Sequence, residues 1–177
     1  MSWLPPLEFR AATARDVDAV VALVESAYRG EASRTGWTTE ADLLDGRRTG
    51  PDDVLASIDR ARSQVLLAER GGKLMACAHV ADDDGFGYFG MFSVVPGLQR
   101  AGIGTQVLAE AERIVREQFG LRTLRMTVID VREELIAYYE RRGYRRTGIR
   151  KPFPYGDERF GLPRRSDLRF EVLEKAL

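Results

Sequence analysis

The sequence has few of the residues that several common kinds of protein depend on. Its 177 residues include one cysteine, Cys77, and one histidine, His79. They therefore offer neither an internal disulfide framework nor the ligand cluster of a zinc site. No apolar run is long enough to span a bilayer, and the N-terminus lacks the basic region and apolar core of a signal peptide. These absences predict a cytoplasmic protein that uses no metal and no membrane.

An excess of charge of either sign is also missing. The 27 basic and 27 acidic residues give a formal net charge of +0. This balance does not favour nucleic acid or an anionic membrane as a partner. The chain contains no internal repeat and no low-complexity tract, and its length suits one domain with a sizeable core. We therefore expect a single domain over residues 1–177.

What the sequence does contain is a strand, a glycine loop and a helix in direct succession. Residues 88–95 are apolar, aromatic and β-branched, which predicts a buried strand that ends at residues 96–97. A helix with one apolar stripe is expected over residues 99–119. The first amides of a helix lack internal partners, and Gly102 and Gly104 would let a diphosphate approach them closely. The alternative is an ordinary tight turn between a strand and a helix.

Two other phosphate-binding patterns do not fit this loop. A P-loop requires a lysine and a Ser or Thr after its last glycine, and no such run exists here. The Rossmann fingerprint requires a third glycine where the chain has Val107. The loop therefore points to a different class of anion site.

The segment VVPGLQRAGIG resembles the acyl-CoA-binding segment of the GNAT superfamily of N-acetyltransferases. That family's pattern is [QR]-x-x-G-x-[GA] after a strand, and Gln99, Gly102 and Gly104 fill its fixed positions. A second segment, AYYERRGY at residues 137–144, is similar to the family's A-x-Y-E-x-x-G-[FY] stretch. The two segments together are far more specific than either alone, and the resemblance extends over residues 7–150.

The resemblance implies a fold and an acyl donor. The fold would be α+β, with a mixed, mostly antiparallel sheet of about seven strands flanked by helices. Its fourth and fifth strands, here residues 88–95 and 121–129, would splay apart to admit the pantetheine arm of acetyl-CoA. The main chain of Ser93 and Val94 would bind that arm, and the following loop would bind the pyrophosphate. The loop residues are Gln99, Arg100, Ala101, Gly102, Ile103, Gly104 and Thr105.

The other elements are expected from periodicity and from turn and cap residues. We predict strands over residues 7–12, 64–70, 73–81, 144–148 and 167–173, and helices over residues 14–28, 38–44, 52–62 and 132–142. Runs of strands mixed with helices in this order indicate an α+β protein.

The catalytic acid is assigned by the same resemblance. Tyr139 occupies the position at which many relatives carry the general acid that protonates the leaving thiolate, and a phenol is neutral at pH 7. The alternative is that Tyr139 only packs in the helix. The base stays open, because residues 88–95 lack the glutamate that relatives often carry there. Candidates are a water held by backbone carbonyls, Glu31 or His79, although a lone histidine is more often structural. Arg132 could approach the cofactor's phosphates.

The acceptor is expected to be a small molecule that carries an amine and a carboxylate. In the resembled fold the segment after the first helix covers the acceptor pocket, and here it contains Glu31, Arg34 and Trp37. An arginine suits a carboxylate, and a tryptophan supplies an apolar wall. The alternative is a solvated loop with Trp37 packed on the core. The 151–165 insertion could close the pocket through Phe153 and Tyr155 or contact a second subunit in a homodimer.

Two functions from different classes remain open at this point. The first is an acetyl-CoA-dependent N-acetyltransferase, which the glycine loop and Tyr139 favour. The second is an acyl-CoA-binding sensor without catalysis, which the missing strand acid keeps open. Transfer of a longer acyl group would depend on the room between the splayed strands.

Overall fold

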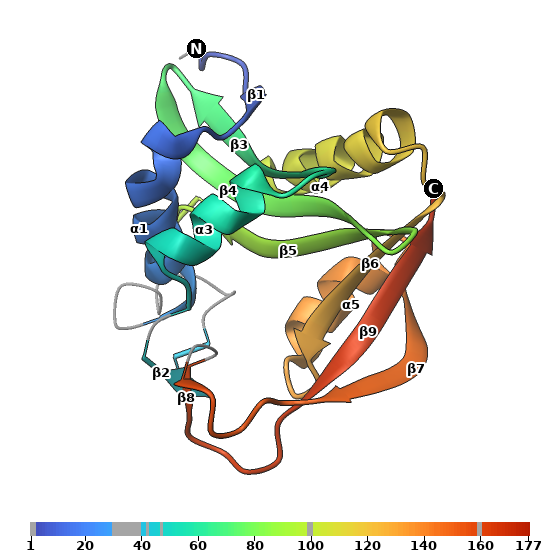
Figure 1. Ribbon diagram of the computed structural model, residues 1–177. Helices are drawn as coiled ribbons and strands as arrows, with labels where there is room; N and C mark the ends of the chain where they lie inside the picture. The colour runs from blue at the N-terminus through green and yellow to red at the C-terminus, as the bar shows by residue number, and fades with distance from the viewer. Residues whose placement is uncertain (1–2, 30–39, 42, 47, 99–100, 159–160) are drawn as a thin grey trace.

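The computed structural model describes residues 3–29, 40–41, 43–46, 48–98, 101–158 and 161–177. A sheet of seven strands runs through it in the order β1-β3-β4-β5-β6-β9-β7 (Figure 1). In that order the strands are β1 (Glu8–Ala11), β3 (Ser63–Arg70), β4 (Lys73–Asp83), β5 (Phe86–Val94), β6 (Thr123–Ile129), β9 (Arg169–Ala176) and β7 (Arg145–Pro152). Every neighbouring pair is antiparallel except β5 and β6. The predicted α+β fold with a mostly antiparallel sheet is confirmed.

Helices cover both faces of the sheet. The 3-10 turn η1 (Ala14–Asp16), α1 (Val17–Tyr28) and α3 (Pro51–Asp59) lie on one face, whereas α4 (Ile103–Arg113), its π-helical extension η2 (Ile114–Gln118) and α5 (Glu133–Glu140) lie on the other (Figure 1). The sheet therefore has a core on each side. Successive residues of β3 alternate between them: Val65 and Leu67 pack with α1 and α3, and Leu66 and Ala68 pack with α4. None of the helices in these described ranges is long and apolar enough to cross a membrane.

The two central strands separate along their length. The parallel strands β5 and β6 pair only at Gly87 with Leu124 and at Tyr88 with Arg125. Beyond Tyr88, β5 continues to Val94 without a partner on that side, so one row of its backbone amides and carbonyls is left unpaired in the sheet. The predicted splay between these strands is confirmed.

A bulge distorts β5 on the unpaired stretch. Its register with β4 shifts between the Cys77–Ser93 pair and the His79–Gly90 pair, so β5 carries one extra residue there. Met91 lies in this bulge with a left-handed φ of 51°. A non-glycine residue in that region costs free energy and often marks a functional site.

The second predicted helix, residues 38–44, is wrong at its C-terminal end. Leu44 begins the short strand β2 (Leu44–Asp45), which pairs with β8 (Leu162–Pro163) in a separate two-stranded sheet. Leu44 is buried with Ile129 and Phe153 in a small apolar cluster, so tertiary packing decides its conformation. Residues 38 and 39, where that helix was predicted to begin, lie outside the described residues.

Other predicted bounds shift by a few residues. The predicted 52–62 helix begins at Pro51 and ends at Asp59, because Arg60 is extended at ψ 138°. The strand predicted over residues 73–81 extends to Asp83, and the turn after it consists of Asp84 and Gly85, both with positive φ, as a two-residue hairpin requires. The last two strands run longer than predicted, because each pairs with its neighbour along most of its length.

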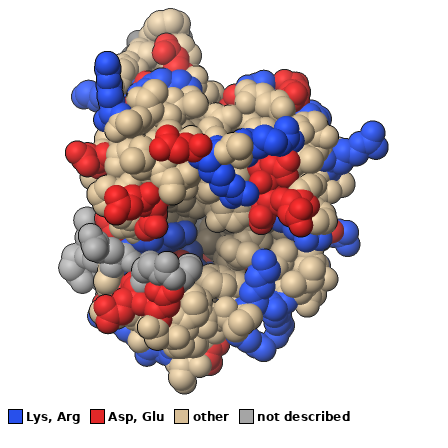
Figure 2. Space-filling model, viewed as in Figure 1, with Lys and Arg blue, Asp and Glu red and all other residues tan. Residues whose placement is uncertain are grey.

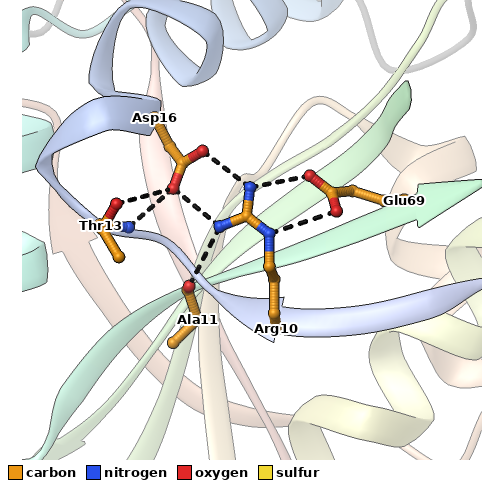
Figure 3. Close-up of polar contacts among 5 residues, drawn as sticks. All are labelled: Arg10, Ala11, Thr13, Asp16 and Glu69. Carbon is orange, nitrogen blue, oxygen red and sulfur yellow. Dashed lines mark hydrogen bonds and ion pairs between the residues drawn. The ribbon is translucent and has the colours of Figure 1, made fainter. Parts of the chain in front are cut away.

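An exposed ionic network holds the N-terminal strand in place (Figure 3). Arg10 of β1 lies between Asp16 of η1 and Glu69 of β3, with nitrogen–oxygen distances of 2.8 Å to each carboxylate. The backbone amide of Thr13 also donates to Asp16, at 2.8 Å. The hydrogen bonds from Arg10 lower the pKa of Asp16 to about 2. The network ties the start of the sheet to α1, which leads into the site.

A candidate active site between the splayed strands

A cavity of about 240 Å³ lies where β5 and β6 separate. Its walls are residues 88–92 of β5, residues 126–129 of β6, the C-terminal end of α1 and one side of α5. Figure 2 shows a hollow in the middle of this face of the molecule, with basic side chains visible inside it. Because the cavity is bounded by α1 from one face of the sheet and by α5 from the other, the gap connects the two faces.

The glycine loop follows the unpaired end of β5. Ala101 donates to the carbonyl of Leu98 at 3.1 Å, and Gly102 is the residue before α4, with φ 78°. A Cβ on Gly102 would meet no atom of the described residues within 4 Å, so these residues leave this side of the loop open. The backbone amides of Ile103, Gly104 and Thr105 follow in the first turn of α4, where amides lack helical partners. Gln99 and Arg100 lie outside the described residues.

The two loop glycines are needed for different reasons. Gly102 needs its left-handed backbone conformation, whereas Gly104 needs its lack of a side chain. A Cβ on Gly104 would lie 3.0 Å from Phe92 and 3.1 Å from the hydroxyl of Tyr138. Ile103 is fully buried, so only its backbone faces the loop.

Arg142 extends from the end of α5 to the first turn of α4. Its guanidinium donates to the hydroxyl of Thr105 at 3.1 and 3.3 Å and lies 3.5 Å from the centre of the Tyr138 ring. A second segment of the chain therefore brings a positive charge to the N-terminal end of α4. Arg142 was not predicted as a site residue, although it is one of the two arginines before the glycine in AYYERRGY.

Ser93 and Val94 lie on β5 beyond its last pairing with β6. Both are buried, and the hydroxyl of Ser93 donates to the carbonyl of Met91 at 3.2 Å. Their main-chain groups, rather than their side chains, are therefore what these two residues can offer a ligand.

Tyr139 is placed by α5 in the wall of the cavity. It is 4 % exposed, with its ring edge-on to Tyr138 and Tyr144. Its hydroxyl makes no hydrogen bond to any residue of the described ranges. Burial, and then the neighbouring Tyr28 and Tyr138, raise the pKa of Tyr139 well above its usual value. The phenol is therefore protonated throughout the physiological pH range.

A buried group of charges forms the other end of the cavity. Glu40 lies between Arg29, which follows α1, and Arg132, which precedes α5. It forms an ion pair with each, and the nitrogen–oxygen distance to Arg132 is 3.2 Å. Burial alone would raise the pKa of Glu40, but Arg132, Arg29 and Arg48 more than offset it and lower that pKa. Glu40 is therefore ionised and held by arginines, which makes it a poor base.

Tyr28 joins this charged end to the bulge of β5. Its hydroxyl donates to the backbone carbonyl of Phe92, and burial raises its pKa to about 12. Arg48 and Arg132 lie 5.4 and 5.9 Å from the centre of its ring. Arg132 thus contacts Glu40 and Tyr28, and its predicted approach to the cofactor's phosphates stays a prediction.

His79 and Cys77 lie on β4, outside the cavity wall. The ring of His79 is 2.7 Å from the hydroxyl of Ser63 and edge-on to Tyr88. Burial, with a smaller effect from Arg60, lowers the pKa of His79 to about 4. Cys77 is fully buried, which raises its pKa to about 12. Both residues therefore fit a structural role better than a catalytic one.

The lowered pKa of His79 predicts an acid-dependent loss of stability. The unfolded chain binds a proton near pH 6.5 and the folded chain only near pH 4. The contribution of neutral His79 to the free energy of unfolding is therefore fully present above pH 6.5. It is lost as the pH drops toward 4, by at most about 3 kcal/mol. Urea unfolding should show this dependence of the free energy of unfolding on pH in the parent protein and not in His79→Gln. Parallel curves between pH 6.5 and 5 would contradict it.

The predicted acceptor residues Glu31, Arg34 and Trp37 lie outside the described residues, so the acceptor loop stays a prediction. Of the two aromatic residues predicted to close the pocket, Phe153 does line the cavity and is buried against Phe170, with ring centres 5.5 Å apart. Tyr155 is exposed, and its hydroxyl donates to the carbonyl of Arg165.

The comparison with protein families gives a match over residues 23–144, to the model described as the acetyltransferase (GNAT) family. No curated protein sequence matches the chain.

Many solved structures share the fold. A ribosomal-protein-alanine N-acetyltransferase from Brucella melitensis aligns at 20 % identity and a TM-score of 0.70, over 96 % of this chain and 99 % of its own. The ribosomal-protein-S18-alanine N-acetyltransferase from Escherichia coli aligns at 16 % identity and a TM-score of 0.68, over 97 % of this chain and 94 % of its own. A GNAT family acetyltransferase from Elizabethkingia anophelis, solved with acetyl-CoA bound, aligns at 20 % identity and a TM-score of 0.56, over 71 % of this chain and 80 % of its own.

Proposed function

Because the chain belongs to the acetyltransferase (GNAT) family, we propose that it transfers the acetyl group of acetyl-CoA to the amine of a small molecule. The observation that carries this proposal is the cavity at the splay. The unpaired edge of β5 and Tyr139 both line this cavity, and the glycine loop follows the end of the same strand. The reaction requires a binding site for the arm of the acyl donor, a site for the donor's pyrophosphate and a group that protonates the leaving thiolate.

The residues present fit acetyl-CoA, which would supply the acetyl group as a thioester. The unpaired backbone of β5 from Phe89 to Val94 can pair with the amides of an extended arm, as an added strand would. The amides after Gly102 and the guanidinium of Arg142 can hold a pyrophosphate. Arg142 adds a charge-assisted contact that the backbone alone cannot make.

Tyr139 would hold the proton that the leaving thiolate takes up. Its raised pKa keeps the proton on the hydroxyl at every physiological pH. The hydroxyl has no partner among the described residues, so it is available to a ligand in the cavity.

The amine must lose its proton elsewhere. Among the described residues that line the cavity, Glu40 is the one carboxylate, and two arginines hold it. We therefore propose that the acceptor reacts as the neutral amine after losing its proton to water.

This proposal predicts how the rate depends on pH. For an acceptor whose amine has a pKa of about 10.4, kcat/KM should rise about tenfold per pH unit between pH 6 and 8, because only the neutral fraction reacts. Initial rates at low acceptor concentration would measure it. A plateau near pH 7 would indicate a base on the protein, and Glu31→Gln would then test the residue that the sequence suggests.

An acceptor screen tests the function itself. Release of free thiol from acetyl-CoA would be followed with amino acids, polyamines and aminoglycosides, with no amine as the control. We expect amine-dependent release for small acceptors. Binding of acetyl-CoA without release for any amine would favour the sensor function instead.

A further inference from the structure

Arg48 differs from the other two arginines of the cavity. Arg29 and Arg132 are both engaged with Glu40, as described above. The guanidinium of Arg48 makes no hydrogen bond or ion pair with a residue of the described ranges and only lies over the ring of Tyr28, at 5.4 Å from its centre. Glu40 and Glu25 favour its charged form electrostatically, but no carboxylate in the part of the chain that the structure describes forms an ion pair with it.

The backbone of Arg48 is nonetheless held firmly. Its amide and that of Thr49 donate to the same carboxylate oxygen of Glu25, at 2.5 and 2.9 Å. Glu25 lies on α1, whose last residue, Tyr28, supplies the ring under the guanidinium. Both ends of the side chain are thus positioned by α1, which favours a binding role over a solvated surface charge.

The cavity as a whole carries an excess of positive charge. Its described lining includes three arginines and one glutamate, which leaves two positive charges uncompensated. A guanidinium stays charged in proteins, and the one carboxylate, Glu40, is already paired with Arg29 and Arg132. An anion in the cavity would balance the excess charge, and a planar guanidinium fork suits the two oxygens of a carboxylate or a phosphonate.

The location of this charge separates it from the cofactor's phosphates. Arg48 lies over Tyr28 at the end of α1, which covers one face of the sheet, whereas the glycine loop leads into α4 on the other face (Figure 1). A pyrophosphate bound at that loop would already be matched by the amides of α4 and by Arg142. The anion that Arg48 faces therefore comes from another part of the reaction.

We propose that Arg48 binds an acidic group, a carboxylate or a phosphonate, of the acceptor and thereby selects acceptors that carry one. The inference rests on the acetyl transfer proposed above, but it names a residue outside the loop from which the sequence predicted acceptor binding. By fixing the acidic group, Arg48 would orient the amine toward the splay and Tyr139.

The test compares acceptors that differ only in the acidic group. Phenylalanine is paired with phenethylamine, and 2-aminoethylphosphonate with ethylamine, in the thiol-release assay with acetyl-CoA. For the acidic member that is acetylated best, we expect kcat/KM at least tenfold above that of its neutral counterpart. Arg48→Gln should raise its KM more than tenfold and leave kcat within about threefold. The KM of the neutral amine should not change.

Two further variants show whether the loss is specific. Arg48→Lys keeps the charge without the planar fork and should restore part of the affinity. Arg15→Gln removes an exposed arginine from η1 and should leave both KM values unchanged. Equal changes of KM for acidic and neutral acceptors in Arg48→Gln, or no change for either, would overturn the proposal.

Failure of the proposed function and failure of this inference can be told apart. If no amine is acetylated, calorimetry with the same acids still measures their binding. Loss of that binding in Arg48→Gln at an unchanged Tm would keep the anion site and reject acetyl transfer. If Arg48→Gln instead abolishes a preference for succinyl-CoA over acetyl-CoA, the anion belongs to the acyl group and the acceptor assignment is wrong.

Discussion

Tyr139→Phe is expected to lower kcat by roughly 10²- to 10⁴-fold, the usual contribution of a positioned proton donor. The change removes one oxygen and keeps the ring that packs against Tyr138 and Tyr144. Affinity for CoA should change little, because the proposed cofactor contacts lie on β5, on the glycine loop and at Arg142. Steady-state kinetics with a saturating acceptor, together with calorimetry of CoA binding, would measure both quantities.

Tyr144→Phe is the matched control for this variant. Tyr144 is also buried beside Tyr139, but its hydroxyl donates to Glu112 at 3.0 Å and it is not in the cavity wall. Its loss should cost stability, on the order of 1 kcal/mol for one hydrogen bond, and leave kcat nearly unchanged. If Tyr139→Phe keeps an acetylation rate within twofold of the parent, Tyr139 is a packing residue and another group supplies the proton.

Gly102→Val is expected to weaken CoA binding by at least about a hundredfold. Two effects combine in this variant. The left-handed conformation at φ 78° is unfavourable for a β-branched residue. The new side chain would also occupy the open space beside the first amides of α4, where the proposal places the pyrophosphate. Calorimetry with CoA would give the change in affinity.

Gly120→Val is a control that separates the backbone strain of a valine at positive φ from the obstruction of the first amides of α4. Gly120 follows η2 with φ 68°, close to the 78° of Gly102, so the backbone strain is comparable. A Cβ on Gly120 would also meet no atom of the described residues within 4 Å. We expect both variants to lose similar stability, and only Gly102→Val to lose CoA affinity. Unchanged affinity in a folded Gly102→Val protein would mean that the pyrophosphate does not lie on these amides.

The elements with strong local patterns could be predicted from the sequence. The run from residue 88 to the glycine loop carries its own stop and start residues, so strand, loop and helix appear in that order in the structure. The splay was expected only because two motifs resemble those of one family. Periodicity carries no information on how far β6 separates from β5, because that separation depends on packing across the sheet.

The charged end of the cavity could not be predicted in the same way. Arg29, Glu40 and Arg132 come from distant parts of the chain that follow no shared pattern. Each one alone looks like an ordinary charged residue near a helix end. The pairing of β2 with β8 was missed for a similar reason, because two strands of two residues each have no periodicity to detect.

The missing acid on β5 has a structural counterpart. Relatives often carry a glutamate on this strand, whereas here the one carboxylate among the described residues of the cavity wall, that of Glu40, is neutralised by arginines. We therefore propose that the chain uses its cavity charges for positioning and that the amine loses its proton to water. The pH dependence of kcat/KM and the Arg48 variants test these two statements separately.

The most direct test of the central claim is a single-turnover experiment with the full chain, acetyl-CoA and the acceptor that performs best in the screen. Free thiol and the mass of the acceptor would be followed together. We predict that thiol and N-acetylated acceptor appear at the same rate and in equal amounts, that neither appears without the amine, and that Tyr139→Phe slows both equally. Tight binding of acetyl-CoA with no thiol release, whichever amine is added, would contradict it.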